Sequence, residues 1–318
     1  MNILISSAGR RVSLIIFFKK ELKKLKSDSK VITTDLDPDM SPACRVSDLS
    51  FKVRNINEEG SIEELINICK KNYISIIIPT IDTELLILSK NQSKFKLNGI
   101  DIILSNPHII KLCRNKRLTN RFFDELKIPR CKEYHFNKLK YPLFIKPIDG
   151  SMSRGLKKIT KKSELNSSEL NNKNNLFLEY IDNNDFDEYT IDMYFNKNSK
   201  LICFVPRRRI EIRAGEVSKS ITDKNILFIK DYFNDNNIGF KGCINLQIFK
   251  NKKTNNIIGI EINPRFGGGY PLSYYAGANY PKMIIKEYLF KEEINDYYEN
   301  WHENTLMLRY DKEIIISC

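Results

Sequence analysis

Two segments in the last quarter of the chain carry carboxylate and amide side chains at every second position. Residues 258–263 alternate isoleucines with Gly259, Glu261 and Asn263, and residues 242–249 alternate aliphatic residues with Asn245 and Gln247. This alternation predicts two strands, each with a polar face for chemistry and an aliphatic face toward the core; in the second strand the core residues would be Ile258, Ile260 and Ile262. The polar stretch 250–256 predicts a hairpin, whose register would set Gln247 opposite Glu261 and Asn245 opposite Asn263.

One carboxylate beside neutral amide oxygens is a donor set for a hard cation such as Mg²⁺, which takes further ligands from water and phosphate. We therefore predict Gln247, Glu261 and Asn263 as metal ligands. Arg265 follows on the same strand parity, and its guanidinium could bind phosphate. An edge hairpin whose polar face meets only water is the alternative, but the glycine-rich exit at 263–269 is better suited to let a ligand approach the backbone.

The run Glu261-Ile262-Asn263-Pro264-Arg265, with Gln247 upstream, resembles the metal-binding signature of the ATP-grasp superfamily. The similarity is to the branch that resembles the carbamoyl-phosphate synthetase large subunit, here with a single ATP-grasp unit, and it covers nearly the whole chain. It implies ATP and Mg²⁺ as cofactors, with two metal ions and with Mn²⁺ as an alternative metal.

The first hundred residues alternate strand and helix patterns. Strands are expected at 2–6, 31–35, 74–79 and 101–105, and helices at 12–25, 61–71 and 82–94, which predicts a doubly wound parallel sheet. We therefore expect an α/β and α+β protein. Its predicted domains are a Rossmann-like pre-ATP-grasp domain (1–106), a small ATP-grasp subdomain with a phosphate-binding loop (107–181) and a C-terminal subdomain with the metal site (182–318).

Lys146 is enclosed by apolar residues in the strand 141–147, and a buried ammonium is costly unless an anion meets it. The glycine- and serine-rich turn that follows can offer backbone N–H groups to phosphate. At this spacing the two features match the family's phosphate-binding lysine and flexible loop, so we predict that Lys146 binds phosphate together with Gly150, Ser151, Ser153 and Gly155.

The resemblance implies further nucleotide contacts. Lys116 falls where the family has a basic residue that reaches the phosphates, although a solvated helix lysine is the alternative. Residues 176–181 match the hinge that binds the adenine edge, with Glu179, Tyr180 and Ile181 as contacts. Glu188 matches the acidic residue that holds the ribose hydroxyls, and a solvated strand carboxylate is the alternative there.

Two regions are candidates for binding the co-substrate. The basic stretch after residue 206 contains Arg213 and Lys219, which we predict to contact an acidic substrate or the transferred phosphoryl group. Arg10, in the turn at residues 6–11, is expected to face the co-substrate, because ligands of doubly wound sheets bind at such strand ends. At 79–82, where a strand ends and a helix begins, Thr80 and Asp82 could equally be helix caps. The full dinucleotide-binding glycine pattern is absent, so no nicotinamide cofactor is predicted.

Composition limits the other classes. The net charge of +13 is spread along the chain without a basic tail or a nucleic-acid motif, so no nucleic-acid partner is expected. The seven cysteines and three histidines have no zinc spacing. Apolar runs are only strand-length and no signal peptide is evident, which predicts a cytoplasmic protein with no membrane partner. A homodimer is left open.

Together these features predict an ADP-forming carboxylate-amine ligase. ATP would convert a substrate carboxylate into an acyl phosphate, and an amine or similar nucleophile would displace the phosphate. A non-catalytic ATP-binding regulatory protein with the same fold is the alternative. Retention of Gln247, Glu261, Asn263 and Arg265 argues against it, because a protein that only binds ATP does not need both metal ligands and the arginine.

Overall fold

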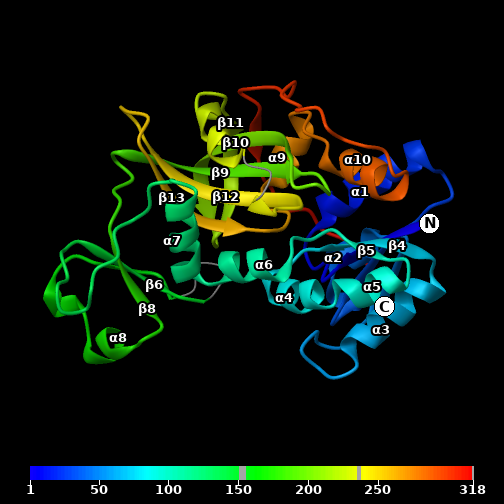
Figure 1. Ribbon diagram of the computed structural model, residues 1–318, viewed down its shortest axis with the longest axis horizontal. Coiled ribbons are helices and arrows are strands. Elements are labelled where there is room, and N and C mark those ends of the chain that lie inside the picture. Colours follow the sequence, from blue (N-terminus) through cyan, green and yellow to red (C-terminus); the bar gives the residue numbers. More distant parts are fainter. Residues whose placement is uncertain (150–154, 235–237, 317–318) are drawn as a thin grey trace.

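The computed structural model describes residues 1–149, 155–234 and 238–316, and strands in these ranges form three sheets (Figure 1). The first sheet has the order β3-β2-β1-β4-β5, and all of its pairs are parallel. Its strands are β1 (Asn2–Ser6), β2 (Val31–Asp35), β3 (Leu49–Lys52), β4 (Ile74–Pro79) and β5 (Asp101–Ile102). The predicted N-terminal parallel sheet is confirmed.

Helices cover both faces of this sheet, which is why its central strands are nearly continuous aliphatic runs. On one face, Ile3 and Ile76 pack with α1 (Val12–Leu25), the short η1 (Pro38–Met40) lies nearby, and α2 (Pro42–Val46) adds buried residues. On the other face, Leu4 and Ile77 pack with α3 (Ser61–Lys71), α4 (Asp82–Lys90) and α5 (Gln92–Leu97). The single helix predicted for 82–94 is wrong, because Asn91 ends α4 and the chain restarts as α5.

A small antiparallel sheet follows and projects to one side of the molecule (Figure 1). Two helices, α6 (Pro107–Arg114) and α7 (Lys116–Glu125), lead into it. Its order is β7-β6-β8, with β6 (Leu143–Pro147) in the centre, β7 (Lys157–Ile159) and β8 (Asn175–Glu179) at its edges, and η2 (Lys162–Glu164) and α8 (Ser167–Asn171) between them. Its core is small and contains Leu143, Ile145, Ile159 and Phe177.

The largest sheet has six strands in the order β13-β12-β9-β10-β11-β14, and its pairs are antiparallel. The strands are β9 (Phe186–Phe195), β10 (Leu201–Arg213), β11 (Glu216–Thr222), β12 (Gly242–Asn251), β13 (Ile257–Asn263) and β14 (Leu306–Leu308). An antiparallel sheet after a parallel one matches the predicted α/β and α+β fold class. Each predicted domain range contains one sheet, and the domain boundaries themselves stay a prediction.

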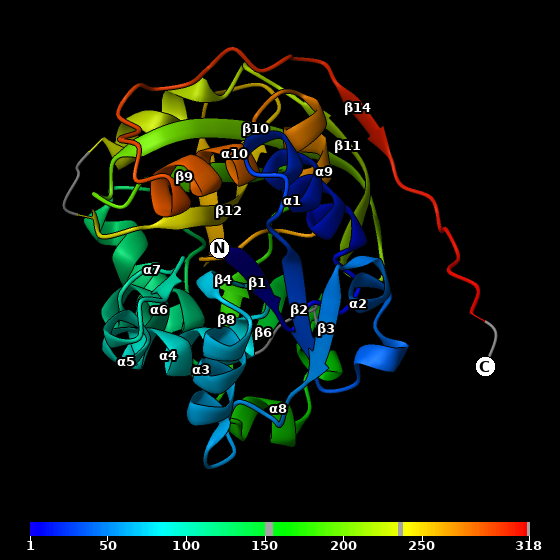
Figure 2. The same cartoon turned by 90° about the vertical axis from the view of Figure 1, so that its right-hand side faces the viewer.

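The two faces of the six-stranded sheet have different partners. One face contributes Ile191, Leu246 and Ile262 to a core with α7 and η3 (Leu227–Phe233). The opposite face packs, at one end, on α1, α9 (Tyr270–Tyr275) and α10 (Tyr280–Ile284), and Figure 2 shows these helices grouped beside the sheet. Phe17 of α1 stacks on Tyr274 of α9 with ring centroids 3.8 Å apart. This shared core fixes the N-terminal sheet against the large sheet.

The hairpin of β12 and β13 has the predicted register, since Gln247 pairs with Glu261 and Asn245 with Asn263. The expected aliphatic face is only partly right. The register shifts by one residue after Gln247, so the core receives Ile257 and Ile262, while Ile258 and Ile260 stay half-buried. A bulge moves one extra residue to the polar side of its strand, and Ile260 consequently lines the cavity described below.

Short elements complete the C-terminal part. The segment η3 is a 3₁₀ helix, and α10 is followed by the π-helical η5 (Ile285–Leu289). Strand β14 closes the edge of the six-stranded sheet by pairing with β11.

Candidate active site

Four neighbouring strands of the large sheet present polar side chains on one face. The strand register aligns them in rows, because Thr190 of β9 lies between Gln247 of β12 and Arg207 of β10. These side chains line a cavity of about 620 Å³ that also reaches the three-stranded sheet and the end of β4. They are Glu188, Thr190, Arg207, Arg209, Asn245, Gln247, Glu261 and Asn263.

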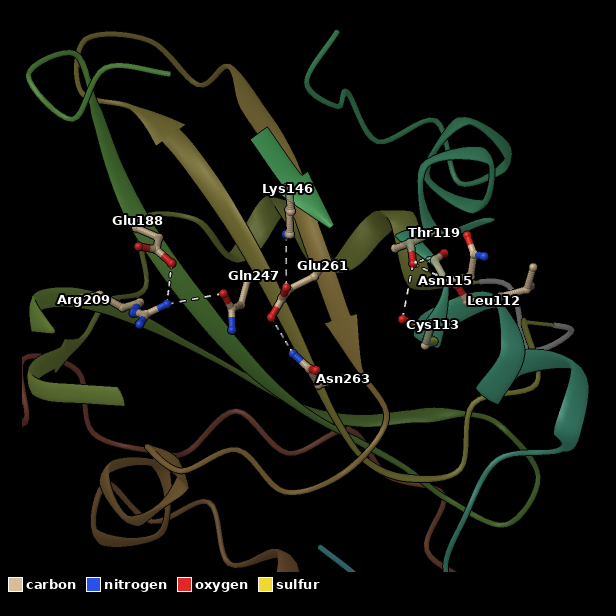
Figure 3. Close-up of polar contacts among 10 residues, drawn as sticks. All are labelled: Leu112, Cys113, Asn115, Thr119, Lys146, Glu188, Arg209, Gln247, Glu261 and Asn263. Atoms are coloured by element: carbon tan, nitrogen blue, oxygen red, sulfur yellow. Dashed lines mark hydrogen bonds and ion pairs between the residues drawn. The ribbon is translucent and has the colours of Figure 1, made fainter. Parts of the chain in front are cut away.

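Lys146 and the predicted metal ligands meet in this cavity (Figure 3). The Lys146 Nζ lies 3.2 Å from Glu261 Oε2, and Asn263 Nδ2 donates to Glu261 Oε1 at 3.0 Å. Gln247 Oε1 accepts from Arg209 Nη1 at 3.3 Å, and Arg209 also pairs with Glu188. The buried ammonium expected at Lys146 is present, since this residue is 8% exposed, and its anion is Glu261.

The charge state of Glu261 follows from these neighbours. Burial would raise its pKa, but Lys146, the Asn263 hydrogen bond and Lys116 together lower the pKa to about 2. Glu188 differs, because burial raises its pKa and Arg209 offsets that effect only in part. Glu261 is therefore ionised throughout the physiological range, as a metal ligand must be.

The donor set near Glu261 fits Mg²⁺. One ionised carboxylate lies between two amide side chains, and all three line the cavity. Within the described ranges no group of three or more His, Cys, Asp or Glu residues could hold a metal ion. A site with so few protein carboxylates is suited to a cation that keeps water and takes phosphate oxygens as its other ligands.

Outside the glycine- and serine-rich turn, the predicted nucleotide contacts line the same cavity, and they come from α7, the three-stranded sheet and the six-stranded sheet. Lys116 opens α7, where Asn115 caps the helix by accepting from Arg117 N at 3.0 Å and Leu118 N at 3.2 Å. Burial is the main cause that lowers the pKa of Lys116, and the positive charge of the nearby Lys146 lowers it further. The wall between the two sheets is formed by Glu179, Tyr180, Ile181 and Glu188.

Figure 3 shows how the start of α7 is held. The Thr119 hydroxyl donates to the Leu112 carbonyl at 2.8 Å, which ties the first turn of α7 to the end of α6. The Lys116 N–H donates to the Ile148 carbonyl at 3.2 Å, next to the lysine strand β6. These contacts bring Lys116 and Lys146 to the same part of the cavity.

Three apolar residues of the cavity wall, Phe144, Phe249 and Ile260, were not predicted as site residues. Phe144 precedes Lys146 by two residues on β6, so strand alternation puts both on one face and could have indicated Phe144. Phe249 lines the cavity from β12 by the same rule. Ile260 reaches the cavity only because of the bulge, which the sequence pattern did not reveal.

Arg265 lies where the large sheet meets the N-terminal domain. Its Nε and Nη2 contact the Asp82 carboxylate at 3.0 and 2.6 Å, and both residues line the cavity. Thr80 is not a helix cap, because its hydroxyl donates to the Ser6 and Ser7 carbonyls at 3.0 and 2.7 Å. Asp82 is the third residue after the strand, where α4 begins, and is the partner of Arg265.

Arg11, and not Arg10, reaches the cavity from the β1–α1 turn. Arg10 is exposed, whereas Arg11 lines the cavity and donates from Nη2 to the Thr80 carbonyl at 3.3 Å. Burial, together with the charge of Arg265, lowers the pKa of Arg11 to about 10. The turn itself is fixed by Asp35, whose Oδ2 accepts from the Gly9 N–H at 2.8 Å, so that N–H is not available to an anion.

The structure does not bring Arg213 and Lys219 to the cavity. Arg213 pairs with Asp311 and Lys219 with Glu211, both at exposed positions on the β10–β11 hairpin. Gly150, Ser151 and Ser153 lie outside the described residues. Gly155 is described at φ +72°, and a Cβ there would lie 2.9 Å from Pro147 Cγ, so this position needs glycine.

Comparisons with known proteins agree with this architecture. Residues 3–103 match the family model "PylC-like, N-terminal domain", and residues 171–308 match "ATP-grasp in the biosynthetic pathway with Ter operon". No curated protein matches the chain by sequence. No helix in the described ranges combines the length and apolar character that a membrane span requires.

Solved structures share the fold at low sequence identity. N5-carboxyaminoimidazole synthetase from Staphylococcus aureus, complexed with ADP, matches at TM-score 0.71 and 15% identity over 93% of this chain and 79% of its own. The biotin carboxylase domain dimer of Hydrogenobacter thermophilus 2-oxoglutarate carboxylase, in complex with MgADP, ADP and bicarbonate, matches at TM-score 0.71 and 14% identity, covering 96% and 73%.

Rhizobium etli pyruvate carboxylase matches at TM-score 0.67 and 14% identity over 87% of this chain, but the chain spans only 27% of that protein. At such identities these likenesses establish the fold, and the family models identify the two parts of the sequence. Residues 171–308 thus match an ATP-grasp family model, and the chain as a whole shares the fold of these solved structures.

Proposed function

We propose that this protein is an ATP-dependent, ADP-forming ligase that activates a substrate carboxylate as an acyl phosphate and joins it to an amine or similar nucleophile. The observation that carries the proposal is the meeting of Lys146, Glu261, Asn263 and Gln247 in one cavity that extends to Arg265. Solved relatives with this fold were complexed with ADP, MgADP and bicarbonate, which supports a nucleotide and an acid in such a cavity.

The nucleotide end of the cavity has the groups that ATP requires. Lys146 and Lys116 supply positive charge for the phosphates, and Phe144 with Ile260 supplies apolar walls for the base. Glu188 lies on the same wall and is the candidate for the ribose hydroxyls. Glu261, Asn263 and Gln247 would hold Mg²⁺, which when bound stabilises negative charge on the phosphoryl group during transfer.

The reaction needs no nucleophile from the protein. An oxygen of the substrate carboxylate attacks the γ-phosphorus of ATP, and ADP leaves. The amine nitrogen then attacks the acyl carbon, phosphate leaves, and the amine loses a proton to solvent. The chain's part is to bind, orient and neutralise: Lys146 and Arg265 lie at the two ends of the route along which the phosphoryl group would pass.

A screen for phosphate release tests the proposal. Purified protein would be given ATP, Mg²⁺ and pools of amino acids, sugar acids and amines, and products would be identified by mass spectrometry. We expect phosphate release that requires both an acid and an amine, with a product mass equal to the sum of the two minus water. Tight ATP binding without turnover in any pool would instead identify a non-catalytic, regulatory ATP-binding protein.

A further inference from the structure

Arg207 of β10 is held deep in the protein with one N–H group left over. It is 1% exposed, and its Nε and Nη2 donate to the Asp192 carboxylate at 2.7 and 3.1 Å. Asp192 also accepts from Ser273 Oγ at 2.5 Å and from Asn245 Nδ2. The Arg207 Nη1 is buried and has no hydrogen-bond partner among the described residues.

A buried guanidinium N–H without an acceptor is costly, so its retention calls for an explanation. Asp192 cannot serve, because both of its oxygens are already engaged by Arg207, Ser273 and Asn245. The Arg207 side chain lines the cavity, on the side where the Gly267–Gly269 segment forms the wall. The spare donor therefore lies at the boundary of the cavity and points to an acceptor that is brought by a ligand.

Gly269 packs directly against this donor. Its φ of −91° is accessible to any residue, so backbone conformation does not require glycine here. A Cβ at this position would lie 2.3 Å from Arg207 Nη1 and 2.7 Å from Val217 Cγ1. Glycine is needed because any side chain would block the nitrogen.

The charged groups around this end of the cavity favour an anion. Arg11 and Arg265 face Asp82 there, while Arg309 pairs with Glu216 at 2.5 Å. With the Arg207–Asp192 pair included, four guanidinium groups meet three carboxylates in the described residues, which leaves one positive charge. A single carboxylate would make the cluster neutral.

We infer that Arg207 Nη1, oriented by Asp192 and bordered by Gly269 at the cavity wall, is the anchor for a carboxylate of the acid co-substrate. The inference rests on the proposed ligase function and deepens it, because it identifies a residue that selects the acid. The competing explanation is that the Arg207–Asp192 pair only joins β10 to β9 and α9. The two explanations differ in the effect that they predict for Arg207→Lys on KM for the acid.

Arg207→Lys keeps a positive charge beside Asp192 but removes the Nη1 donor, because an ammonium lacks the fork of the guanidinium. Arg208→Lys is the matched control, because Arg208 neighbours it on β10, points to the opposite face and does not line the cavity. ADP formation would be measured with the twenty amino acids, succinate, citrate and gluconate as acids, and with ammonia and lysine as amines. The melting temperature without ligand would report folding, and its increase on addition of MgADP would report nucleotide binding.

We expect Arg207→Lys to raise KM for the acid on the order of ten- to a hundredfold, the scale of one hydrogen bond to a charged group. KM for ATP and the MgADP-induced thermal shift should match those of the wild type and of Arg208→Lys. If Arg207→Lys proves unstable, Gly269→Ala provides the second test. It alters no charge, obstructs Nη1 and should give the same selective loss of acid affinity.

Two results would overturn the inference. If the wild-type protein forms ADP with an acid, and both Arg207→Lys and Gly269→Ala leave KM for that acid unchanged, Arg207 is purely structural and the ligase function stands. If no acid in the panel supports ADP formation by the wild-type protein, the ligase proposal fails and the inference fails with it.

Discussion

Two ion pairs at the cavity wall connect the large sheet to other parts of the protein. The large sheet supplies the anion in one pair and the cation in the other. At the nucleotide end, Lys146 from the small sheet pairs with Glu261 of the large sheet. At the co-substrate end, the large sheet supplies the cation, Arg265, and the N-terminal domain supplies the anion, Asp82. Each pair therefore joins two parts of the protein at the cavity wall.

The two ends differ in how their residues come together. The predicted metal ligands come from one hairpin with a local polar pattern, whereas Lys146 joins Glu261 across 115 positions and Arg265 joins Asp82 across 183. The hairpin pattern can be read from the sequence, and the two ion pairs depend on tertiary packing. Variants at each end test the roles proposed for them.

The largest effect is expected from Glu261→Ala. The change removes the only carboxylate among the predicted metal ligands, and no aliphatic core residue is altered. We expect metal-dependent ADP formation to fall by two to three orders of magnitude or more, the scale seen when groups that stabilise transition-state charge are lost. Circular dichroism would confirm folding. Near-normal turnover by a folded Glu261→Ala protein would show that the metal ligands were misassigned.

Arg265→Ala should have the next largest effect. A guanidinium near the path of the phosphoryl group contributes most as charge develops, so turnover should fall on the order of a hundredfold while nucleotide affinity changes far less. Arg265→Lys should restore activity only in part.

Asp82→Asn is the control for this second prediction, because it breaks the same ion pair and leaves Arg265 in place. We expect its turnover to stay well above that of Arg265→Ala. Equal losses in the two variants would mean that Arg265 acts through the link between domains and not on the phosphoryl group.

Lys146→Met should weaken ATP binding by about tenfold or more, since a partly desolvated ammonium on phosphate is worth at least one charge-assisted hydrogen bond. Titration calorimetry with a non-hydrolysable ATP analogue would measure this. Lys157→Met is a suitable comparison, because Lys157 on the neighbouring strand pairs with Glu169 outside the cavity. Equal affinities for all three proteins would remove Lys146 from the nucleotide site.

A smaller effect is expected from Arg11→Ala, compared with Arg10→Ala. Arg11 lines the cavity and Arg10 is exposed, so only the first change should raise KM for the acid, by several-fold, with KM for ATP nearly constant. Steady-state kinetics with each substrate varied in turn would show the difference. Equal effects of the two substitutions would indicate that the turn acts through general electrostatics.

Much of the nucleotide end could be predicted because its information is local. Strand alternation and hairpin length determine the pairing of Gln247 with Glu261, and apolar neighbours indicate that Lys146 is buried. The bulge that turns Ile260 toward the cavity could not be predicted, because the pattern is equally regular with or without it. Bulges depend on cross-strand packing that a single strand does not reveal.

The co-substrate end could be predicted much less well. Neighbouring arginines are alike in sequence, and only the path of the turn decides that Arg11 faces inward and Arg10 outward. The basic surroundings of Arg213 favour a substrate contact, but this side chain lies at an exposed position and pairs with Asp311. A usable signal for Arg207 did exist: Asp192 interrupts the otherwise apolar run 191–195 of β9, and a buried carboxylate requires a cation nearby.

The last and smallest effect concerns stability against pH. The folded pKa of Glu261, about 2, is below its ordinary value of 4.5, so ionised Glu261 stabilises the folded state above pH 4.5. This contribution is lost as the pH falls from about 4.5 toward 2. Lys146→Met removes the main cation that lowers this pKa, so burial should dominate and raise it. The free energy of unfolding of Lys146→Met minus that of the wild type should therefore increase as pH falls from 6 to the lowest pH at which both proteins fold. Urea denaturation across that range measures the difference, and a gap independent of pH would mean that Lys146 does not control the ionisation of Glu261.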